Sequence, residues 1–300
     1  MASLYTRKSK NIRKTWILFS VFLIIVIGLG WIFSQAYGSP AILWFAVIFS
    51  TLMSFLSYWY SDKIVISLSR AKPVTIETAP ELYRVLENLT ITAGLPMPKI
   101  YLVPDRAPNA FATGRDPEHA TVAVTEGLLL KLDRTELEGV LAHEMSHIGN
   151  RDMLVGTVVV VLVGFISILA DIFIRSVFWG GAGSRNDRGN AGAILFLSGF
   201  ILSILAPIAA TLIQLAISRR REFLADVSGA MLTRYPEGLA SALEKISADP
   251  TPMRTATATT AHLWLADPFK DKRKTPWWQR LLMTNPPIGE RIKILRDLAI

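Results

Sequence analysis

The sequence predicts a predominantly α integral membrane protein with four transmembrane helices and a small α+β domain on the cytoplasmic side. Of its 300 residues, 51% are hydrophobic and only 19% are charged, a balance that is unusual for a purely soluble fold. Four apolar runs each have about the 20 residues that a helix needs to cross a bilayer. Two longer segments that are rich in charged residues follow the second and the fourth of these runs. The chain has no cysteine, which excludes disulfide frameworks, thiolate metal sites and cysteine-dependent enzymes.

The first two spans are predicted at residues 16–35 and 41–60, and the third and fourth at residues 153–174 and 191–217. Pro207 in the fourth run is tolerated inside a packed bundle. A cleaved signal peptide is an alternative interpretation of the first run, because basic residues precede it. We favour a retained span, because this run is longer than a signal core and a second run follows after a few residues.

The positions of the basic residues predict the topology. A basic cluster precedes the first span, and Arg219, Arg220 and Arg221 follow the fourth; both are typical of a cytoplasmic side. The external loop at residues 175–190, with its three arginines, fits this rule less well. We therefore expect a multi-pass protein of the cell (plasma or inner) membrane, with both termini in the cytoplasm. These basic flanks account for the net charge of +8, so we expect no nucleic-acid partner.

Four segments follow from this topology: residues 1–60 with the first two spans, 61–152, 153–217 with the other two spans, and 218–300. The second and fourth segments share the cytoplasmic face. Within the second, the pattern predicts a helix at residues 80–92 that stops at Gly94, a strand at 99–103, a loose hairpin of 109–113 and 121–125, and a helix that starts with a capping box at Thr135–Glu138 and runs through His147.

The strongest chemical signal lies on that last helix, in the sequence from His143 to His147. Residues four apart project from nearly the same face of a helix, so the two imidazoles can bind one zinc ion. Glu144 is placed to hold the water on that metal. The alternative is a pair of unliganded surface histidines, but two of the four histidines in the chain fall in this motif. We expect one Zn²⁺ per chain.

A hydrolytic zinc site needs three protein ligands and one open position. His119 and His262 are possible third ligands, although each stands alone in a loop-like segment. Glu222 is the better candidate, because Asp226 lies one helical turn later and can accept the free ring N–H of a ligating histidine. The third and fourth spans form a hairpin between His147 and Glu222, which returns the chain to the same side of the bilayer.

Four motifs together resemble one known family, the HtpX-like membrane zinc proteases, which are related to the CAAX prenyl proteases. The resemblance covers essentially the whole chain and includes the four-span layout. The motifs are Pro108–Gly114, Leu141–Ile148, Glu222–Asp226 and Asn285–Ile292.

The resemblance implies a zincin-like (gluzincin) catalytic domain and a role in the cleavage of unfolded or damaged membrane proteins near the cytoplasmic membrane surface, as part of protein quality control under stress. The expected partners are protein substrates and the lipid bilayer. The implied residues are the zinc ligands His143, His147 and Glu222, the catalytic acid/base Glu144, the supporting residues Asp226 and Arg291, and the substrate-cleft residues Asn109, Ala110, Phe111 and Ala112.

One position departs from the family pattern. The family often has a histidine before the Pro-Pro pair, where it steadies the transition state, whereas this chain has Asn285. An amide can still donate a hydrogen bond but supplies neither charge nor acid/base chemistry, so we expect Asn285 to substitute in part. His262 is a less favoured replacement.

Other functions stay open at this stage. An intramembrane protease would carry its zinc motif inside an apolar run, whereas charged residues flank this one. A prenyl-protein protease is expected to have more spans than this chain can hold. A zinc-binding transporter or an inactive membrane scaffold is the alternative from another class, and Glu144 argues against it because a pure binding site does not require that carboxylate.

Overall fold

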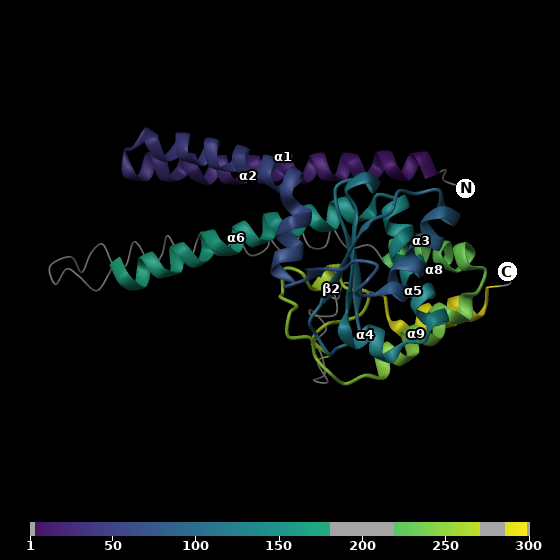
Figure 1. Cartoon of the computed structure of the whole chain (residues 1–300). Helices are drawn as coiled ribbons and strands as arrows, with labels where there is room; N and C mark the ends of the chain where they lie inside the picture. Colours follow the sequence, from purple (N-terminus) through teal and green to yellow (C-terminus); the bar gives the residue numbers. More distant parts are fainter. Residues whose placement is uncertain (1–3, 181–218, 271–285, 299–300) are drawn as a thin grey trace.

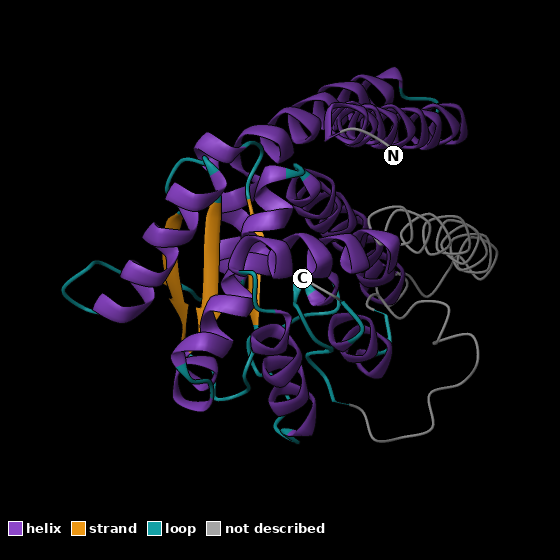
Figure 2. Ribbon diagram, turned by 90° about the vertical axis from the view of Figure 1, so that its right-hand side faces the viewer, coloured by secondary structure: helices purple, strands orange, loops and turns teal. Residues whose placement is uncertain are grey.

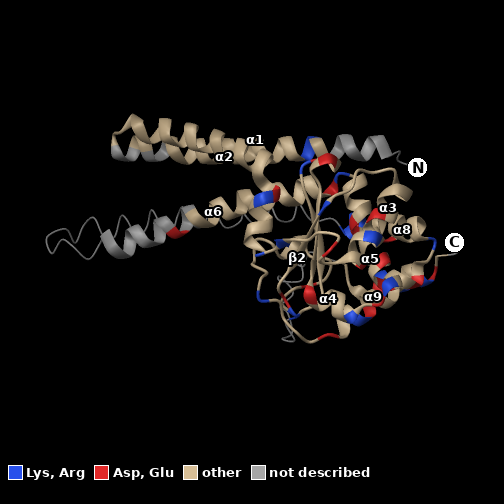
Figure 3. Cartoon of the chain, viewed as in Figure 1, with Lys and Arg blue, Asp and Glu red and all other residues tan. Residues whose placement is uncertain are grey.

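The computed structural model describes residues 4–180, 219–270 and 286–298. Within these residues the protein is mostly helical, and long helices extend from one side of a domain that contains a small sheet (Figure 1). Lys, Arg, Asp and Glu gather on that domain, whereas the parts of the long helices that Figure 3 colours carry few of them. Charge and apolar surface are therefore separated along the molecule.

Three helices form the apolar part: α1 (Leu4–Tyr37), α2 (Pro40–Leu68) and α6 (Asp152–Gly180). The first two make a hairpin whose tight turn uses Gly38 at φ 62°, a conformation that glycine adopts at little cost. Two segments, Asn11–Trp31 and Pro40–Leu68, are long and apolar enough to cross a membrane. This finding agrees with the first two predicted spans.

Large apolar side chains face outwards on α1 and α2. Ile24 is 71% exposed, Trp44 66% and Phe45 65%. Such a continuous exposed apolar surface is expected where lipid rather than water surrounds a helix. The inner faces of the two helices pack with α6 into a separate apolar cluster. The arrangement is that of a membrane protein.

The third predicted span falls within α6. This helix follows α5 (Arg134–Gly149) after a break of two residues, and the two axes are bent by 83°; together they form a third candidate span. Arg151 at the break has φ 56°. The fourth predicted span, residues 191–217, lies outside the described residues.

The sheet has four strands in the order β1-β2-β4-β3 (Figure 2). β2 pairs parallel to β4, whereas β3 pairs antiparallel to β4, which confirms the predicted hairpin. β3 is an edge strand. The predicted strand at residues 99–103 is also confirmed, whereas β1 escaped prediction because it is too short to carry a pattern. The bounds are β1 Lys72–Pro73, β2 Lys99–Val103, β3 Ala110–Thr113 and β4 Thr121–Thr125.

α5 begins with a capping box, but two residues earlier than predicted. Asp133, rather than Thr135, is the N-cap: its Oδ1 accepts from the Glu136 backbone N–H at 3.0 Å, and Glu136 Oε2 accepts from the Asp133 N–H at 2.9 Å. Glu136 also accepts from Lys245 Nζ at 2.7 Å. The prediction missed the start because Asp133 and Thr135 are both good caps, and only the partners that buried Glu136 finds on α9 (Pro236–Ala248) select between them.

α5 is the centre of the main apolar core, between α3 (Pro80–Ala93), α8 (Arg219–Thr233), α9 (Pro236–Ala248) and α11 (Ile288–Arg296). α3 matches the predicted helix and ends at Gly94 as expected. Two glycines allow the neighbours of α5 to approach closely. A Cβ on Gly229 of α8 would lie 2.9 Å from His143 N, and one on Gly139 would lie 2.6 Å from Leu239 N. α8 is therefore fixed directly against the histidine-bearing turn.

The chain after α9 crosses the edge of the sheet. The Leu265 N–H donates to the Ala110 carbonyl at 3.0 Å, and Trp264 packs edge-on against Phe111 with ring centroids 4.7 Å apart. A short 3₁₀ helix, Ala261–Leu263, precedes this contact. This crossing joins the sheet to the two helices α2 and α6 through one apolar cluster.

Candidate metal centre

Three potential metal ligands meet where α5 and α8 touch. His143 and His147 stand four positions apart on α5, and Glu222 lies in the first turn of α8. Their ligand atoms all lie within 4.8 Å of one another, and no other such group of three occurs among the described residues. Glu222 is far from the two histidines in sequence, and the close packing of α8 on α5 brings the three side chains together.

The distances suit a tetrahedral ion. His143 Nε2 lies 3.2 Å from His147 Nε2 and 3.6 Å from Glu222 Oε2, and the His147–Glu222 distance is 3.8 Å. Ligands about 2.05 Å from a tetrahedral zinc ion are roughly 3.3 Å apart. The side chain of His143 is 1% exposed, whereas those of His147 and Glu222 are 15% and 19% exposed. The group is thus closed on the His143 side and reachable from the other.

A buried ionic network supports His143. Its Nδ1 lies 2.9 Å from Asp226 Oδ1, one turn after Glu222 on the same helix. Arg291 of α11 donates to both oxygens of Asp226, from Nε at 2.8 Å and Nη2 at 2.7 Å, and from Nη1 to the Leu265 carbonyl at 2.9 Å. Both Asp226 and Arg291 are fully buried. Charge pairing offsets the cost of burying each of them, and it holds α8 and α11 together behind the ligands.

A second carboxylate lies beside His147, and no local sequence pattern predicts it. Asp152, the first residue of α6, places Oδ2 3.5 Å from His147 Nδ1. Its Oδ1 accepts from Asn11 Nδ2 at 2.7 Å, and the same amide donates to the Asn150 carbonyl at 3.2 Å. The available signal was a carboxylate five residues after His147, but only the bend between α5 and α6 brings it back to the imidazole.

Glu144 follows His143 on α5 and is 2% exposed. Burial raises the pKa of Glu144, and the positive charges of nearby His143 and His147 partly oppose that rise. A carboxyl group with a raised pKa is suited to take up and release a proton. This side chain therefore has the environment of a general base beside the ligand group.

The ligands are electrostatically coupled. Burial alone would raise the pKa of Glu222, but His147 and His143 hold it well below its ordinary value. Burial would lower the pKa of His147, but Glu222 and Asp152 raise it well above its ordinary value. Each charge thus depends on its partners, as expected where a cation and carboxylates share one site.

Asn109, which is expected in the substrate cleft, is buried and its amide is already hydrogen-bonded within the chain. Its amide is 1% exposed; Nδ2 donates to the Ala266 carbonyl at 2.9 Å, and Oδ1 accepts from the Ala266 N–H at 3.1 Å. Nδ2 also lies 3.4 Å from Met253 Sδ. The amide is therefore occupied as a clamp on the chain that follows α9, and a donor bond to substrate would require that clamp to open. Sequence alone does not reveal a partner 157 positions away.

The expected strand at Ala110, Phe111 and Ala112 is present as β3, but part of its outer edge is already paired. In the ladder with β4, Thr125 N–H donates to the Asn109 carbonyl, so the backbone groups of Ala110 and Ala112 point to the opposite edge. The Leu265 N–H donates to the Ala110 carbonyl, so this acceptor on the outer edge is already used. Among the described residues, Ala112 has no backbone partner on that edge.

The remaining histidines lie apart from the ligand group. His119 is in the connection between β3 and β4, with its ring 2.6 Å from Asp116 Oδ1. The ring of His262 lies 3.1 Å from the Gly156 carbonyl of α6. Neither belongs to the candidate metal-binding cluster of the described residues, which agrees with the preference for Glu222. Asn285 lies outside the described residues.

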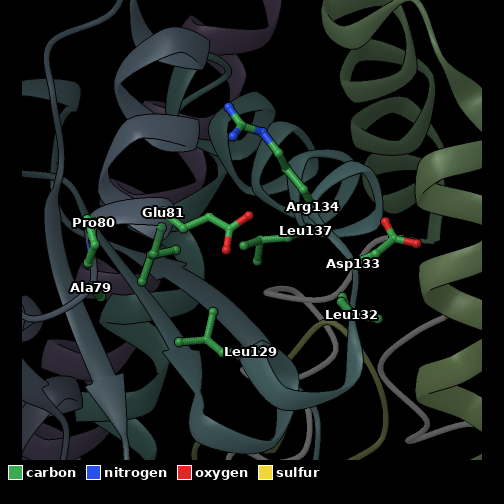
Figure 4. Close-up of a pocket in the computed structure, with 9 residues that line it drawn as sticks. Ala79, Pro80, Glu81, Leu129, Leu132, Asp133, Arg134 and Leu137 are labelled. Carbon is green, nitrogen blue, oxygen red and sulfur yellow. The ribbon is translucent and has the colours of Figure 1, made fainter.

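A cavity of about 290 Å³ at the start of α5 is remote from this centre. It is lined by the beginning of α3, the end of the short helix α4 (Glu126–Lys131) and the first turn of α5, and its lining includes Leu129, Leu132 and Leu137 together with Glu81, Asp133 and Arg134 (Figure 4). His147 lies at the opposite end of α5. This cavity is therefore separate from the ligand group.

Comparison with known proteins places these features in a family. The model of peptidase family M48 matches residues 77–299. A protein called Protease HtpX homolog from Caldanaerobacter subterraneus subsp. tengcongensis is 45% identical over 302 residues, covering 99% of both chains. The protein of that name from Pyrococcus furiosus is 44% identical, covering 96% of both chains.

A solved structure supports the fold. The crystal structure of S. mikatae Ste24p matches with a TM-score of 0.52 and 20% identity, covering 95% of this chain and 67% of that one. This likeness concerns the arrangement of the chain alone. The relatives agree in sequence from end to end, and the family match spans every residue of the ligand group, so this membrane protein belongs to peptidase family M48 and is a metalloprotease.

Proposed function

We propose that the chain binds one Zn²⁺ through His143, His147 and Glu222 and works as an endopeptidase at the cytoplasmic surface of the membrane. The observation that carries this proposal is the convergence of the three ligand atoms, with a carboxylate behind each imidazole. Two nitrogens and one oxygen leave a fourth position open, the arrangement of a hydrolytic rather than a structural zinc site.

Zinc in this place would lower the pKa of a bound water and polarise a peptide carbonyl. Glu144 takes the proton from the attacking water and passes it to the leaving amine, for which its raised pKa is suited. Asp226 and Asp152 fix the orientation of His143 and His147. Arg291 holds Asp226 in place from behind.

The substrate is proposed to lie as an extended strand along the outer edge of β3. Main-chain pairing is the same for every side chain, which suits an enzyme that accepts many unfolded sequences. Ala112 offers the donor and acceptor for this pairing, while Ala110 and Phe111 continue the strand. Asn285 remains the predicted donor that steadies the transition state, and its replacement by alanine should lower activity if that prediction holds.

The position of the centre favours substrates at the membrane. Asp152, which contacts His147, is the first residue of α6, so the ligands lie within a few residues of the third predicted span. We propose four spans, with residues 61–152 and 218–300 forming one zincin-like (gluzincin) catalytic domain on the cytoplasmic face. Membrane proteins and their cytoplasmic loops are then the substrates within reach, in keeping with quality control.

The test compares wild-type protein with Glu144→Ala, both purified in detergent, stripped with chelator and reloaded with zinc. Wild type should cleave an unfolded protein only after zinc is restored, and Glu144→Ala should bind one zinc without cleavage. Glu138→Ala, on the same helix and away from the ligands, is the matched control and should stay active. Stoichiometric zinc without cleavage by wild type, in detergent and in nanodiscs, would instead support the alternative of a zinc-binding transporter or scaffold.

A further inference from the structure

A second cavity, of about 520 Å³, lies between the end of α2 and the sheet. One wall is the stretch of α2 that contains Trp59, Tyr60 and Lys63. The other consists of Lys99 at the start of β2 and of Arg115 and His119 in the connection from β3 to β4. This cavity, which we call the α2–sheet pocket, shares no residue with the metal centre.

The pocket lies at the level where a membrane span meets water. The apolar part of α2 gives way to polar residues at Asp62 and Lys63. Trp59 and Tyr60, just before this change, are 44% and 45% exposed. Exposed tryptophan and tyrosine at the end of a span are typical of the headgroup region. The charge distribution agrees, since charged side chains begin at this end of α2 (Figure 3).

Positive charge dominates the pocket. Lys63, Lys99 and Arg115 line it against one acidic residue, Asp62. Lys63 lies 5.2 Å from the ring centroid of Tyr60, and among the described residues neither lysine forms an ion pair. Both ammonium groups are therefore available to an anion, while the neighbouring aromatic rings offer an apolar wall.

Arg115 is held in a fixed place in this pocket. Its guanidinium lies 4.4 Å from the centroid of the Trp59 ring. Nη2 contacts His119 Nε2 at 2.7 Å, and Nε donates to Asp116 Oδ2 at 3.2 Å. Asp116 offsets part of the charge of Arg115, but it also fixes the direction of the guanidinium. An arginine so placed on an aromatic ring is pre-organised for a phosphate.

We propose that the α2–sheet pocket binds the phosphate headgroup of an anionic phospholipid. The lysines and Arg115 provide the charge for the phosphate, and Trp59 and Tyr60 provide contacts for the glycerol and the first acyl carbons. A lipid is the expected occupant because the pocket opens at the end of an apolar helix, where a headgroup is always close. The inference rests on the proposed topology in one respect, namely that α2 crosses the membrane with this end beside the catalytic domain.

Lipid binding in this pocket would have a consequence for the catalytic domain. Arg115 lies two residues after Thr113, the last residue of β3. A bound headgroup therefore ties α2, β2 and the end of β3 to the membrane surface. It would fix the strand to which the substrate is proposed to bind at a constant distance from the bilayer.

The experiment measures lipid retention by native mass spectrometry. Full-length Glu144→Ala protein, which should not digest itself, is released from nanodiscs made of equal parts phosphatidylglycerol and phosphatidylcholine. Phosphatidylglycerol should stay bound in preference, and Lys63→Gln/Lys99→Gln should weaken its affinity by roughly 25-fold, since each basic residue near an anionic surface contributes about fivefold. Lys72→Gln/Lys293→Gln removes the same charge from exposed positions elsewhere and should retain the lipid.

Two outcomes would overturn the proposal. Equal lipid loss in both double variants would show a general charge effect without a pocket. Inorganic phosphate that stabilises the detergent-solubilised protein, with Lys63 and Lys99 required for the effect, and that displaces phosphatidylglycerol at millimolar concentration would identify a site for soluble phosphate instead. Because neither readout involves proteolysis, failure of the protease proposal and failure of the lipid proposal remain distinguishable.

Discussion

Asn11 Nδ2 donates a hydrogen bond to Asp152 Oδ1 at 2.7 Å, across 141 positions of sequence. The other oxygen of this carboxylate lies 3.5 Å from His147 Nδ1. One side chain thus links the first membrane helix to a candidate metal ligand. Asn11 is 6% exposed, so water does not compete strongly for the bond. The membrane part and the metal centre are joined by a polar contact as well as by apolar packing.

This link predicts that Asp152 and Asn11 tune metal affinity. Asp152→Ala should weaken zinc binding by about 10- to 100-fold, which is usual when the carboxylate behind a ligating histidine is lost. Asn11→Ala, which only frees the carboxylate to turn, should have a smaller effect in the same direction. Competition with a chromogenic chelator measures both. Asn88→Ala, at an exposed position of α3, is the control, and an Asp152→Ala protein with unchanged affinity would refute the positioning role.

The pair of Arg291 and Asp226 predicts a large stability effect. Arg291→Met leaves Asp226 buried without its partner and should lower the stability of the catalytic domain by about 3–5 kcal/mol. Arg296→Met removes an arginine from the same helix, where it pairs with exposed Glu237 and Glu244, and should leave the stability nearly unchanged because solvent screens such pairs. Denaturant midpoints in detergent compare the two variants. Similar midpoints would contradict the importance of the buried pair.

Ala112, the unpaired position on the outer edge of β3, predicts a defect in substrate binding without a defect in metal binding. Ala112→Pro removes the outward N–H, and proline is tolerated on an edge strand. We expect kcat/KM for an unfolded protein to fall by about fivefold, since about 1 kcal/mol of hydrogen bonding is lost, while zinc affinity stays the same. Ala112→Ser retains the N–H and should behave like wild type. A proline variant with normal kcat/KM would mean that the substrate lies elsewhere.

His262 predicts a pH dependence of stability. Burial lowers the pKa of His262 to about 4, an effect that nearby Arg221 reinforces and the bond to the Gly156 carbonyl opposes. In the unfolded chain this imidazole takes up a proton near pH 6.5, whereas the buried ring stays neutral until the pH approaches 4. The free energy of unfolding is therefore at its full value above pH 6.5 and decreases as the pH falls towards 4. The loss is at most about 3 kcal/mol, and less to the extent that water reaches the ring.

Melting temperatures measured in detergent between pH 7.5 and 4.5 check this prediction. His262→Gln keeps a polar group near Gly156 but does not titrate, so its melting temperature should fall less steeply than that of wild type. His119→Gln, which changes an exposed ring, should follow wild type. Parallel curves for wild type and His262→Gln would exclude His262 as the titrating group.

Local patterns predicted the elements and ligands that depend on neighbouring residues. Helical spacing identified His143 and His147, and the carboxylates of Glu222 and Asp226 at the same spacing pointed to the facing helix. The supporting contacts were harder to predict, because they join distant segments. Asp152 reaches His147 only through the bend after α5, and the amide of Asn109 is taken by Ala266, a residue that no local pattern connects to it.

The bend of 83° between α5 and α6 also determines how far from the bilayer surface the enzyme can act. If α6 stands upright in the bilayer, α5 lies almost flat along its surface, and its histidines stay close to that surface. A segment that has come loose from a membrane protein and trails along the surface is already at this height. One helix junction would therefore favour damaged chains over intact ones before any side chain is recognised.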